Sequence, residues 1–187
     1  MRISAILLAA GESKRFGSHK LSYVYKGKPL VQHALDTLSS VSAITEIKVV
    51  VNNTKPYALS PEPYALIVNS DYKQGMGTSL REGVRACSDN TDAYLIALAD
   101  MPHVQKETVE ALITEYHKGN CEILIPKYKE QKGHPIIMSA RFKEELLSLN
   151  QDKGARDVIG AHEESVGFVD VEDGGVLFDV DVREDVT

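Results

Sequence analysis

The sequence predicts an α/β protein in which a mostly parallel, twisted sheet carries helices on both faces. Apolar runs such as residues 2–10 and 93–100 are nearly unbroken instead of alternating, which is typical of strands buried on both faces. Segments with a helical spacing of apolar residues come between these runs, over about 130 residues. This alternation favours a doubly wound sheet with right-handed crossovers.

The elements can be placed in order along the chain. Pro29 is suited to the first turn of a helix, and apolar residues then recur with a helical period up to Leu38. Three prolines mark residues 53–63 as a connection. The expected strands are 2–10, 44–52, 64–69, 93–100 and 121–128, and the expected helices are 30–38, 78–87 and 109–116.

The rhythm changes after Gly133. We expect a short strand at 134–139, helices at 140–149 and 152–162, and two further strands at 166–173 and 176–182. Gly174 and Gly175 between the last two strands are suited to a tight turn. No repeat, low-complexity tract or linker interrupts the chain, so we expect one domain over residues 1–187.

Composition indicates an ordinary soluble protein, with 43% hydrophobic and 26% charged residues. No apolar run approaches the roughly 20 residues that span a bilayer, and the first one leads into a polar loop instead of a cleavage site. We therefore expect a cytoplasmic protein without a membrane partner. Cys87 and Cys121 lie far apart in apolar patterns, which favours buried reduced thiols over a disulfide or a metal pair.

Charge points to a small anionic ligand. The net charge of -6 argues against nucleic acid, which requires a broad basic surface. Residues 11–28 nevertheless carry five cations against one acid. A local basic patch on an acidic protein suits a small anion better than a polymer.

The basic segment begins with LLAAGESKRFGSHK, residues 7–20, directly after the first strand. Ligands of doubly wound sheets bind outside the carboxyl ends of the strands, where backbone N–H groups and cations can hold phosphates. Gly11, Arg15 and Lys20 are the candidates. The alternative is that these cations are only solvated surface charges.

Two common phosphate loops are excluded. A Walker loop requires G-x-x-x-x-G-K-S/T, whereas Gly11 and Gly17 are separated by five residues and Ser18 follows Gly17. The dinucleotide fingerprint G-x-G-x-x-G fails because a single glycine lies at the turn. A triphosphate held by a longer loop with positive side chains fits the pattern.

Asp100 is the candidate metal ligand. It ends the apolar run 93–100 and precedes Met101 and Pro102. Mg²⁺ prefers one or two carboxylates together with substrate phosphates, and such an acid at a strand end is placed for that role. The alternative is that Asp100 caps the helix expected near Gln105.

Seven motifs in order make the chain resemble the MobA-like NTP transferases, and within them the molybdenum cofactor cytidylyltransferase branch. They are LLAAGESKRFGSHKL with KGKPLVQHALDTL, NSDYKQGMGTSLREGV, ALADMPHV, GHPIIMSARFKEEL, DKGARDVI and VLFDVDVREDV. The resemblance implies a Rossmann-like nucleotidyltransferase fold of the glycosyltransferase-A-like kind. It also implies transfer of a nucleotidyl group from an NTP to a phosphorylated acceptor, with release of pyrophosphate.

The resemblance further implies roles for particular residues. Catalysis would fall to Arg15, Lys20 and Asp100, and the residues expected along the nucleotide are Leu8, Ala9, Ala10, Gly11, Gly75, Met76 and Ser79 together with those three. Asp100 would bind Mg²⁺, with Asp179 or, as our choice, Asp181 as second ligand, although alternating acids are usually a solvated strand face. His134 would face the acceptor, although a histidine before proline is more often a loop or core residue.

The base is expected to be cytosine. The cytidylyl branch resembles LAAG where the guanylyl branch has LAGG, and this chain has Ala9 and Ala10 there. The methyl group of Ala10 would fill space that a purine needs, a mismatch of roughly 1 to 3 kcal/mol. Tyr23 and Tyr25 stand where the family often has smaller aliphatic residues, so we expect the acceptor wall to differ.

The leading hypothesis is a Mg²⁺-dependent cytidylyltransferase that joins CTP to a molybdopterin-type cofactor. Its ligands are therefore an NTP and a pterin, and the candidate protein partner is a molybdoenzyme or its maturation chaperone. One alternative keeps the chemistry with a sugar or polyol phosphate as acceptor. The other is a non-catalytic nucleotide-binding maturation factor for a molybdoenzyme.

Overall fold

The computed structural model describes residues 1–16, 19–52, 63–150 and 154–186. Gly17 and Ser18 of the basic loop, nearly all of the connection expected at 53–63 and part of the helix expected at 152–162 lie outside the described residues. No helix among the described residues is long and apolar enough to cross a membrane.

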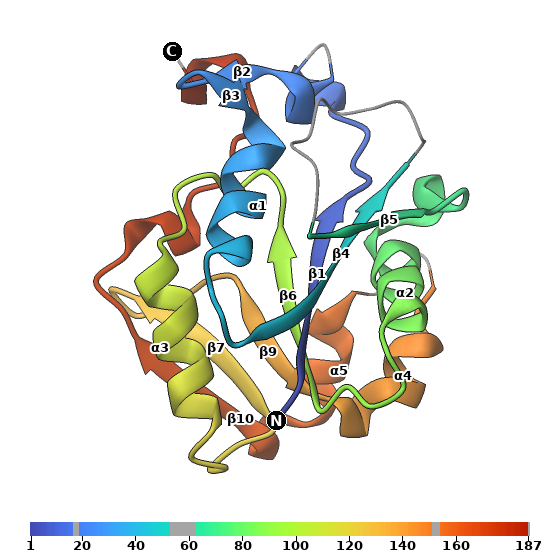
Figure 1. Cartoon of the computed structure of the whole chain (residues 1–187), viewed down its shortest axis with the longest axis vertical. Coiled ribbons are helices and arrows are strands. Elements are labelled where there is room, and N and C mark those ends of the chain that lie inside the picture. Colours follow the sequence, from blue (N-terminus) through green and yellow to red (C-terminus); the bar gives the residue numbers. More distant parts are fainter. Residues whose placement is uncertain (17–18, 53–62, 151–153, 187) are drawn as a thin grey trace.

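One mixed sheet runs through the molecule (Figure 1). Its strands in the described residues are β1 (Ile3–Ala9), β4 (Ile44–Val51), β5 (Ala65–Val68), β6 (Ala93–Leu98), β7 (Ile123–Tyr128), β8 (Gln131–Lys132), β9 (Ile136–Ser139) and β10 (Val166–Asp170). Their order is β10-β7-β9-β6-β1-β4-β5, and β8 pairs with β7. β9 runs antiparallel to β6 and β7, while β1, β4, β5 and β6 are mutually parallel and β10 is parallel to β7. The predicted mostly parallel sheet is confirmed.

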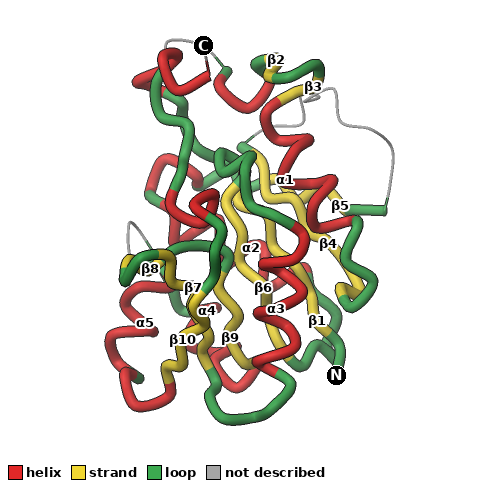
Figure 2. Tube along the Cα trace, turned by 90° about the vertical axis from the view of Figure 1, so that its left-hand side faces the viewer, coloured by secondary structure: helices red, strands yellow, loops and turns green. Residues whose placement is uncertain are grey.

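Helices cover both faces of this sheet, as predicted. They are α1 (Leu30–Ser39), α2 (Met76–Ala86), α3 (Lys106–Tyr116), α4 (Lys143–Leu147) and α5 (Ala155–Ala161). α1 and α3 pack with one apolar core, while α2, α4 and α5 pack with the other. Figure 2 shows α1 and α3 together in front of the strands. A short hairpin of β2 (Val24–Tyr25) and β3 (Lys28–Pro29) precedes α1.

The strand order reverses beside β1, which is almost completely buried and lies parallel between β4 and β6. Leu8 faces Val50 on one side and Leu98 on the other. α1 follows β1 over one face, and α2 leads into β6 over the opposite face. Loops that leave β1 and β6 therefore diverge at their carboxyl ends, the place where doubly wound sheets bind ligands.

The two strands expected around Gly174 and Gly175 are only half confirmed. The first is β10 and a tight turn does begin at Gly174, but the prediction of a strand at 176–182 is wrong. Residues 174–177 form a 3₁₀ turn, and residues 178–182 have no regular structure. We call residues 173–186 the strap, because this segment crosses the carboxyl ends of the strands toward the β2–β3 hairpin (Figure 1).

The strap is not a strand because its backbone bonds to loops. The Val176 carbonyl accepts a hydrogen bond from His134 N at 3.0 Å, and Val180 N donates to the Asp100 carbonyl at 2.9 Å. Val176 and Val180 are completely buried against the body of the protein. The alternating apolar pattern that predicted a strand therefore reflects side chains that anchor the strap.

Candidate active site

A cleft of about 400 Å³ opens at the carboxyl ends of β1 and β6. The residues predicted to bind a nucleotide or metal that line it are Leu8, Ala9, Ala10, Gly11, Arg15, Lys20, Met76, Ser79, Asp100, Asp179 and Asp181. Ser13, Leu21, Tyr72 and Leu98 also line it and were not anticipated. Segments far apart in the sequence thus contribute to one cavity of a size that suits a small-molecule ligand.

The segment after β1 forms one wall without side-chain bulk. A Cβ atom at Gly11 would meet no described atom within 4 Å, so packing does not explain the glycine. Glycine allows a ligand to approach the backbone closely, and a side chain here would project into open space beside the cleft. The methyl group of the neighbouring Ala10 is buried at the same wall.

Asn52 supports this wall from the end of β4. Its Nδ2 lies 3.4 Å from both the Ala10 and the Gly11 carbonyl oxygens. Its Oδ1 is a buried atom without a hydrogen-bond partner among the described residues. Asn52 was not singled out from the sequence, although its position at the end of a parallel strand beside β1 was the available signal.

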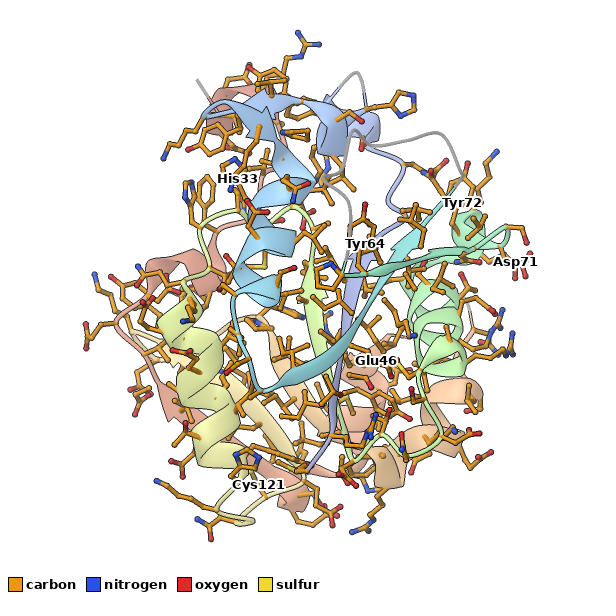
Figure 3. The ribbon with its side chains drawn as sticks, in the orientation of Figure 1. His33, Glu46, Tyr64, Asp71, Tyr72 and Cys121 are labelled. Carbon is orange, nitrogen blue, oxygen red and sulfur yellow. The ribbon has the colours of Figure 1, made fainter. Side chains whose placement is uncertain are left out.

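A buried asparagine fixes the start of α2 on the opposite wall. Asn69 Nδ2 donates to Thr78 Oγ1 and Ser79 Oγ, each at 2.9 Å, and its Oδ1 accepts from Asp71 N. Gly75 precedes the helix with a φ of 125°, which disfavours other residues. Gly75 was predicted to line the nucleotide site, but it does not line the cleft and only sets the start of α2. Tyr72, which does line the cleft, lies near the same end of α2 (Figure 3).

Three acids meet on the floor of the cleft. Asp100, Asp179 and Asp181 each offer a carboxylate oxygen, and these oxygens lie within 4.8 Å of one another. Asp100 follows β6, whereas the other two belong to the strap. Clustered carboxylate oxygens are the ligands that hard cations such as Mg²⁺ and Mn²⁺ prefer, so these residues fit a divalent metal. Asp100 does not cap α3, because the cap position is Gln105 and its backbone N–H bonds to Asp173.

Two cations from the basic loop face these acids. Lys20 Nζ lies 2.9 Å from Asp100 Oδ2 and 3.7 Å from Asp181 Oδ1, and Arg15 Nη1 lies 2.8 Å from Asp181 Oδ2. The Lys20 side chain is 11% exposed, whereas that of Arg15 is 74% exposed. Lys20 is therefore a fixed charge inside the cleft, and Arg15 is a solvated charge at its edge.

His134 does not line the cleft. It borders a small adjoining cavity with Pro135, next to residues of α1 and α3. Burial lowers the pKa of His134, the Asp100 carboxylate opposes that shift, and Arg156 adds to it. The imidazole is therefore neutral at pH 7. Its predicted contact with the acceptor stays a prediction.

Tyr25, one of the two tyrosines expected to alter the acceptor wall, belongs to a column of contacting rings. The rings of Tyr25 and His103 have centroids 5.6 Å apart, and those of His103 and Phe178 are 5.1 Å apart. Tyr25 Oη also lies 3.2 Å from His103 Nε2. Tyr25 therefore joins the β2–β3 hairpin to the strap through His103.

The two cysteines take no part in this site. Both are free thiols; Cys87 is buried and Cys121 is half-buried. Burial raises the pKa of Cys87 to about 12 and also raises the pKa of Cys121. Both thiols are protonated at neutral pH, as the prediction of structural thiols requires.

The fold and the cleft define an α/β enzyme that handles a nucleotide, with acids and cations facing each other at the sheet's switch point. The chain belongs to the family described as "MobA-like NTP transferase domain", which matches residues 5–166. It is a nucleotidyltransferase of the MobA-like type. The family predicted from the motifs is thereby confirmed.

The chain is similar in sequence to relatives that have different names. The chain is 30% identical to a probable molybdenum cofactor guanylyltransferase of Thermococcus gammatolerans, over 75% of this chain and 71% of that protein. It is 29% identical to a nicotine blue oxidoreductase of Paenarthrobacter nicotinovorans, over 97% and 93%. It is 28% identical to the purine catabolism protein PucB of Bacillus subtilis, over 96% and 92%.

Solved structures agree with the fold. Rv0371c of Mycobacterium tuberculosis superimposes with a TM-score of 0.85 at 24% identity, over 98% of this chain and 94% of that one. A structure of the same protein in complex with manganese has a TM-score of 0.81 at 22% identity, over the same shares. The predicted Rossmann-like fold is confirmed, and a structural neighbour binds a divalent metal.

Proposed function

We propose that this chain transfers the cytidylyl group of CTP to the terminal phosphate of a molybdopterin-type cofactor, with Mg²⁺ bound by the clustered acids. The observation that carries the proposal is the arrangement of Asp100, Asp179 and Asp181 against Lys20 and Arg15 across one cleft. An NTP brings negative phosphates that require both a metal and cations at short range.

Base choice rests on the wall after β1. Ala10 carries a methyl group where the guanylyl branch has glycine, and this residue lines the cleft. The guanylyltransferase of Thermococcus gammatolerans matches 75% of the chain, whereas two relatives with other names match 96% or more. The methyl group of Ala10 takes space that a purine would need, which supports the proposal of a pyrimidine base.

The chemistry needs no general base from the protein, because the acceptor phosphate is already ionised near pH 7. Its oxygen forms a bond to the α-phosphorus of CTP, and the bond from that phosphorus to the bridging oxygen breaks. Pyrophosphate leaves with the electron pair. His134 does not line the cleft, and this scheme requires no proton transfer to it.

Catalysis then consists of positioning and charge neutralisation. Asp100, Asp179 and Asp181 would hold the metal, which when bound neutralises charge on the phosphates. Lys20, fixed by its contact with Asp100, supplies a further positive charge inside the cleft. Arg15 adds a solvent-exposed cation at the edge of the cleft, where the leaving group would depart.

Release of pyrophosphate tests the proposal. The protein is incubated with Mg²⁺ and either CTP or GTP, with a molybdopterin-type acceptor, a sugar phosphate, or no acceptor. We expect release that requires the pterin and is faster with CTP. Asp100→Asn should lower the rate at least about 100-fold, since it removes charge from the metal site. The control Asp89→Asn changes a fully exposed acid that pairs with Lys143 and does not line the cleft, and it should leave the rate unchanged.

Each part of the proposal has its own contrary result. Full turnover by Asp100→Asn removes that residue from the metal site. Faster release from GTP overturns the base assignment. Release with the sugar phosphate alone favours the other acceptor class, and nucleotide binding without any release favours a non-catalytic maturation factor.

A further inference from the structure

Asp173 is a buried acid that neither the motifs nor the cleft account for. Its side chain lies at the first residue of the strap and is 3% exposed. Its Oδ2 accepts hydrogen bonds from Gln105 N at 2.9 Å and from Thr108 Oγ1 at 2.7 Å. Its Oδ1 accepts from Gly175 N at 2.8 Å. One carboxylate thus joins the start of α3 to the start of the strap.

The charge of Asp173 matches its place. The amino-terminal end of α3 presents unpaired backbone N–H groups and the positive end of the helix dipole, which a carboxylate stabilises. Gln105, at the cap position of α3, has no side-chain hydrogen bond of its own to the helix. The cap therefore comes from a residue 68 positions later in the sequence.

Close backbone contacts continue the attachment along the strap. A Cβ atom at Gly175 would lie 2.3 Å from the His103 carbonyl oxygen, and one at Gly133 would lie 2.3 Å from the Val176 carbonyl oxygen. The backbone of the strap therefore rests directly on the loops after β6 and before β9. Close packing therefore restricts movement of the strap at its amino-terminal end.

The same strap supplies two of the three clustered acids. Asp179 and Asp181 flank Val180, whose N–H donates to the carbonyl of Asp100 itself at 2.9 Å. Asp173 is six residues from Asp179, and the intervening segment is pinned at Gly175 and Val176. Displacement of the strap at Asp173 would therefore change the separation of Asp179 and Asp181 from Asp100.

We propose that Asp173 is a positioning residue for the metal site, which it assembles by fixing the strap to α3. The inference rests on the metal role that we proposed for Asp100, Asp179 and Asp181. Mg²⁺ requires near-ideal octahedral geometry, so a small shift of two ligands lowers its affinity. The residue does not itself contact the cleft, and it acts through the strap.

Mn²⁺ affinity, measured on the full chain by the loss of the free-ion EPR signal, tests this inference. Asp173→Asn keeps the size of the side chain and replaces one acceptor oxygen with a donor group. Thr108→Val removes the hydroxyl that donates to Asp173 and keeps nearly the same shape, whereas Thr108→Ser keeps the hydroxyl. Asp181→Asn changes a proposed ligand directly. Asp170→Asn is the matched control, because Asp170 is an exposed acid of β10 outside the cleft.

We expect Asp173→Asn to weaken Mn²⁺ binding about 10- to 100-fold, as loss of a residue that orients metal ligands typically does. Thr108→Val should weaken it less, while Thr108→Ser and Asp170→Asn should resemble the unchanged protein. CTP affinity measured without metal should be unchanged in Asp173→Asn, because the walls formed after β1 and by α2 are untouched. A purely structural defect would lower both affinities together.

The outcomes separate this inference from the proposed function. Wild-type Mn²⁺ affinity in both Asp173→Asn and Thr108→Val, with weaker binding in Asp181→Asn, overturns the positioning role alone. Unaltered affinity in Asp181→Asn together with Asp100→Asn overturns the metal site itself. If Asp173→Asn does not fold, the contrast between Thr108→Val and Thr108→Ser decides, and equal affinities in that pair reject the inference.

Discussion

Gly11 leaves one wall of the cleft without a side chain, and the neighbouring residues give it no packing partner. A Cβ atom there would meet no described atom within 4 Å, and the backbone at Gly11 has no positive φ that would require glycine. The residue is therefore better explained by what binds beside it than by the fold. Asn52, which holds the carbonyl groups of Ala10 and Gly11, keeps this wall in place.

Substitution of Gly11 tests this explanation at the residue scale. Gly11→Ala should leave the free energy of unfolding within about 1 kcal/mol, because the methyl group meets nothing in the protein. It should weaken CTP binding at least about tenfold, because the methyl group enters space that the ligand would take. Isothermal titration with CTP and urea unfolding measure the two quantities.

Gly160→Ala is the matched control. A Cβ atom at Gly160 also meets no described atom, but this glycine lies in α5 and away from the cleft. Its substitution should leave CTP affinity unchanged and raise stability slightly, since alanine favours a helix. Equal CTP affinity in Gly11→Ala and the unchanged protein would show that the wall does not contact the nucleotide.

Residues of the site differ in how far the sequence could predict them. Arg15 and Lys20 are cations in the loop after β1, and Asp100 is an acid just after β6. Their charge and position predicted their roles, and the structure brings them together. Asn69 and Asp173 could not be found in the same way. Asn69 depends on Thr78 as its acceptor and Asp173 depends on Thr108 as its donor, and folding brings these partners together from positions that no local sequence pattern links.

A polar network joins elements at the end of the sheet opposite the cleft. Glu46 of β4 accepts from Ser4 Oγ of β1 at 2.6 Å and from Ser88 N, just after α2, at 2.8 Å. Lys48 Nζ lies 2.8 Å from the same carboxylate. Burial alone would raise the pKa of Glu46, but hydrogen bonds from Lys48, Ser4 and Ser88 lower it to about 2. Figure 3 labels this side chain on β4.

Acid unfolding should report this network. The pKa of Glu46 is lower in the folded chain than its ordinary value of 4.5, so its stabilisation is complete above pH 4.5. That stabilisation is lost as the pH falls from about 4.5 toward 2, and it amounts to about 2 kcal/mol after allowance for solvent screening.

Urea midpoints between pH 6 and pH 2 measure the effect. Glu46→Gln should be less stable at pH 6 and should lose less stability on acidification than the unchanged chain. Parallel pH profiles for the two proteins would remove Glu46 from the account.

The strap shows why an alternating apolar pattern does not always form a strand. Its buried valines give the sequence pattern of a strand, but its backbone forms hydrogen bonds with loops.

The molecule combines a sheet that local patterns predict with a strap that they do not. Unbroken apolar runs and helical periods depend on burial of each segment by itself, and so β1, β6 and the helices could be placed from sequence. The antiparallel direction of β9 and the path of the strap depend on pairing between distant segments. The cleft needs both, because the sheet supplies Asp100 and the strap supplies the other two acids.

Positive and negative charges that meet in the cleft come from different parts of the molecule. The net charge is -6, yet the loop after β1 delivers Arg15 and Lys20 to the acids of the strap. Ion pairs join the loop to the strap at the cleft, and a bound metal and triphosphate would contact both segments. The acids, the cations and the glycine wall thus form one site only in the folded chain.

The location of Mn²⁺ in crystals grown with a non-hydrolysable CTP analogue tests the central claim most directly. The anomalous signal should show an ion bound to Asp100 and to at least one of Asp179 and Asp181. The phosphates should lie beside Lys20 and Arg15, and the cytosine should lie along residues 8–11. An ion bound away from these acids, or a nucleotide outside the cleft, would contradict the account.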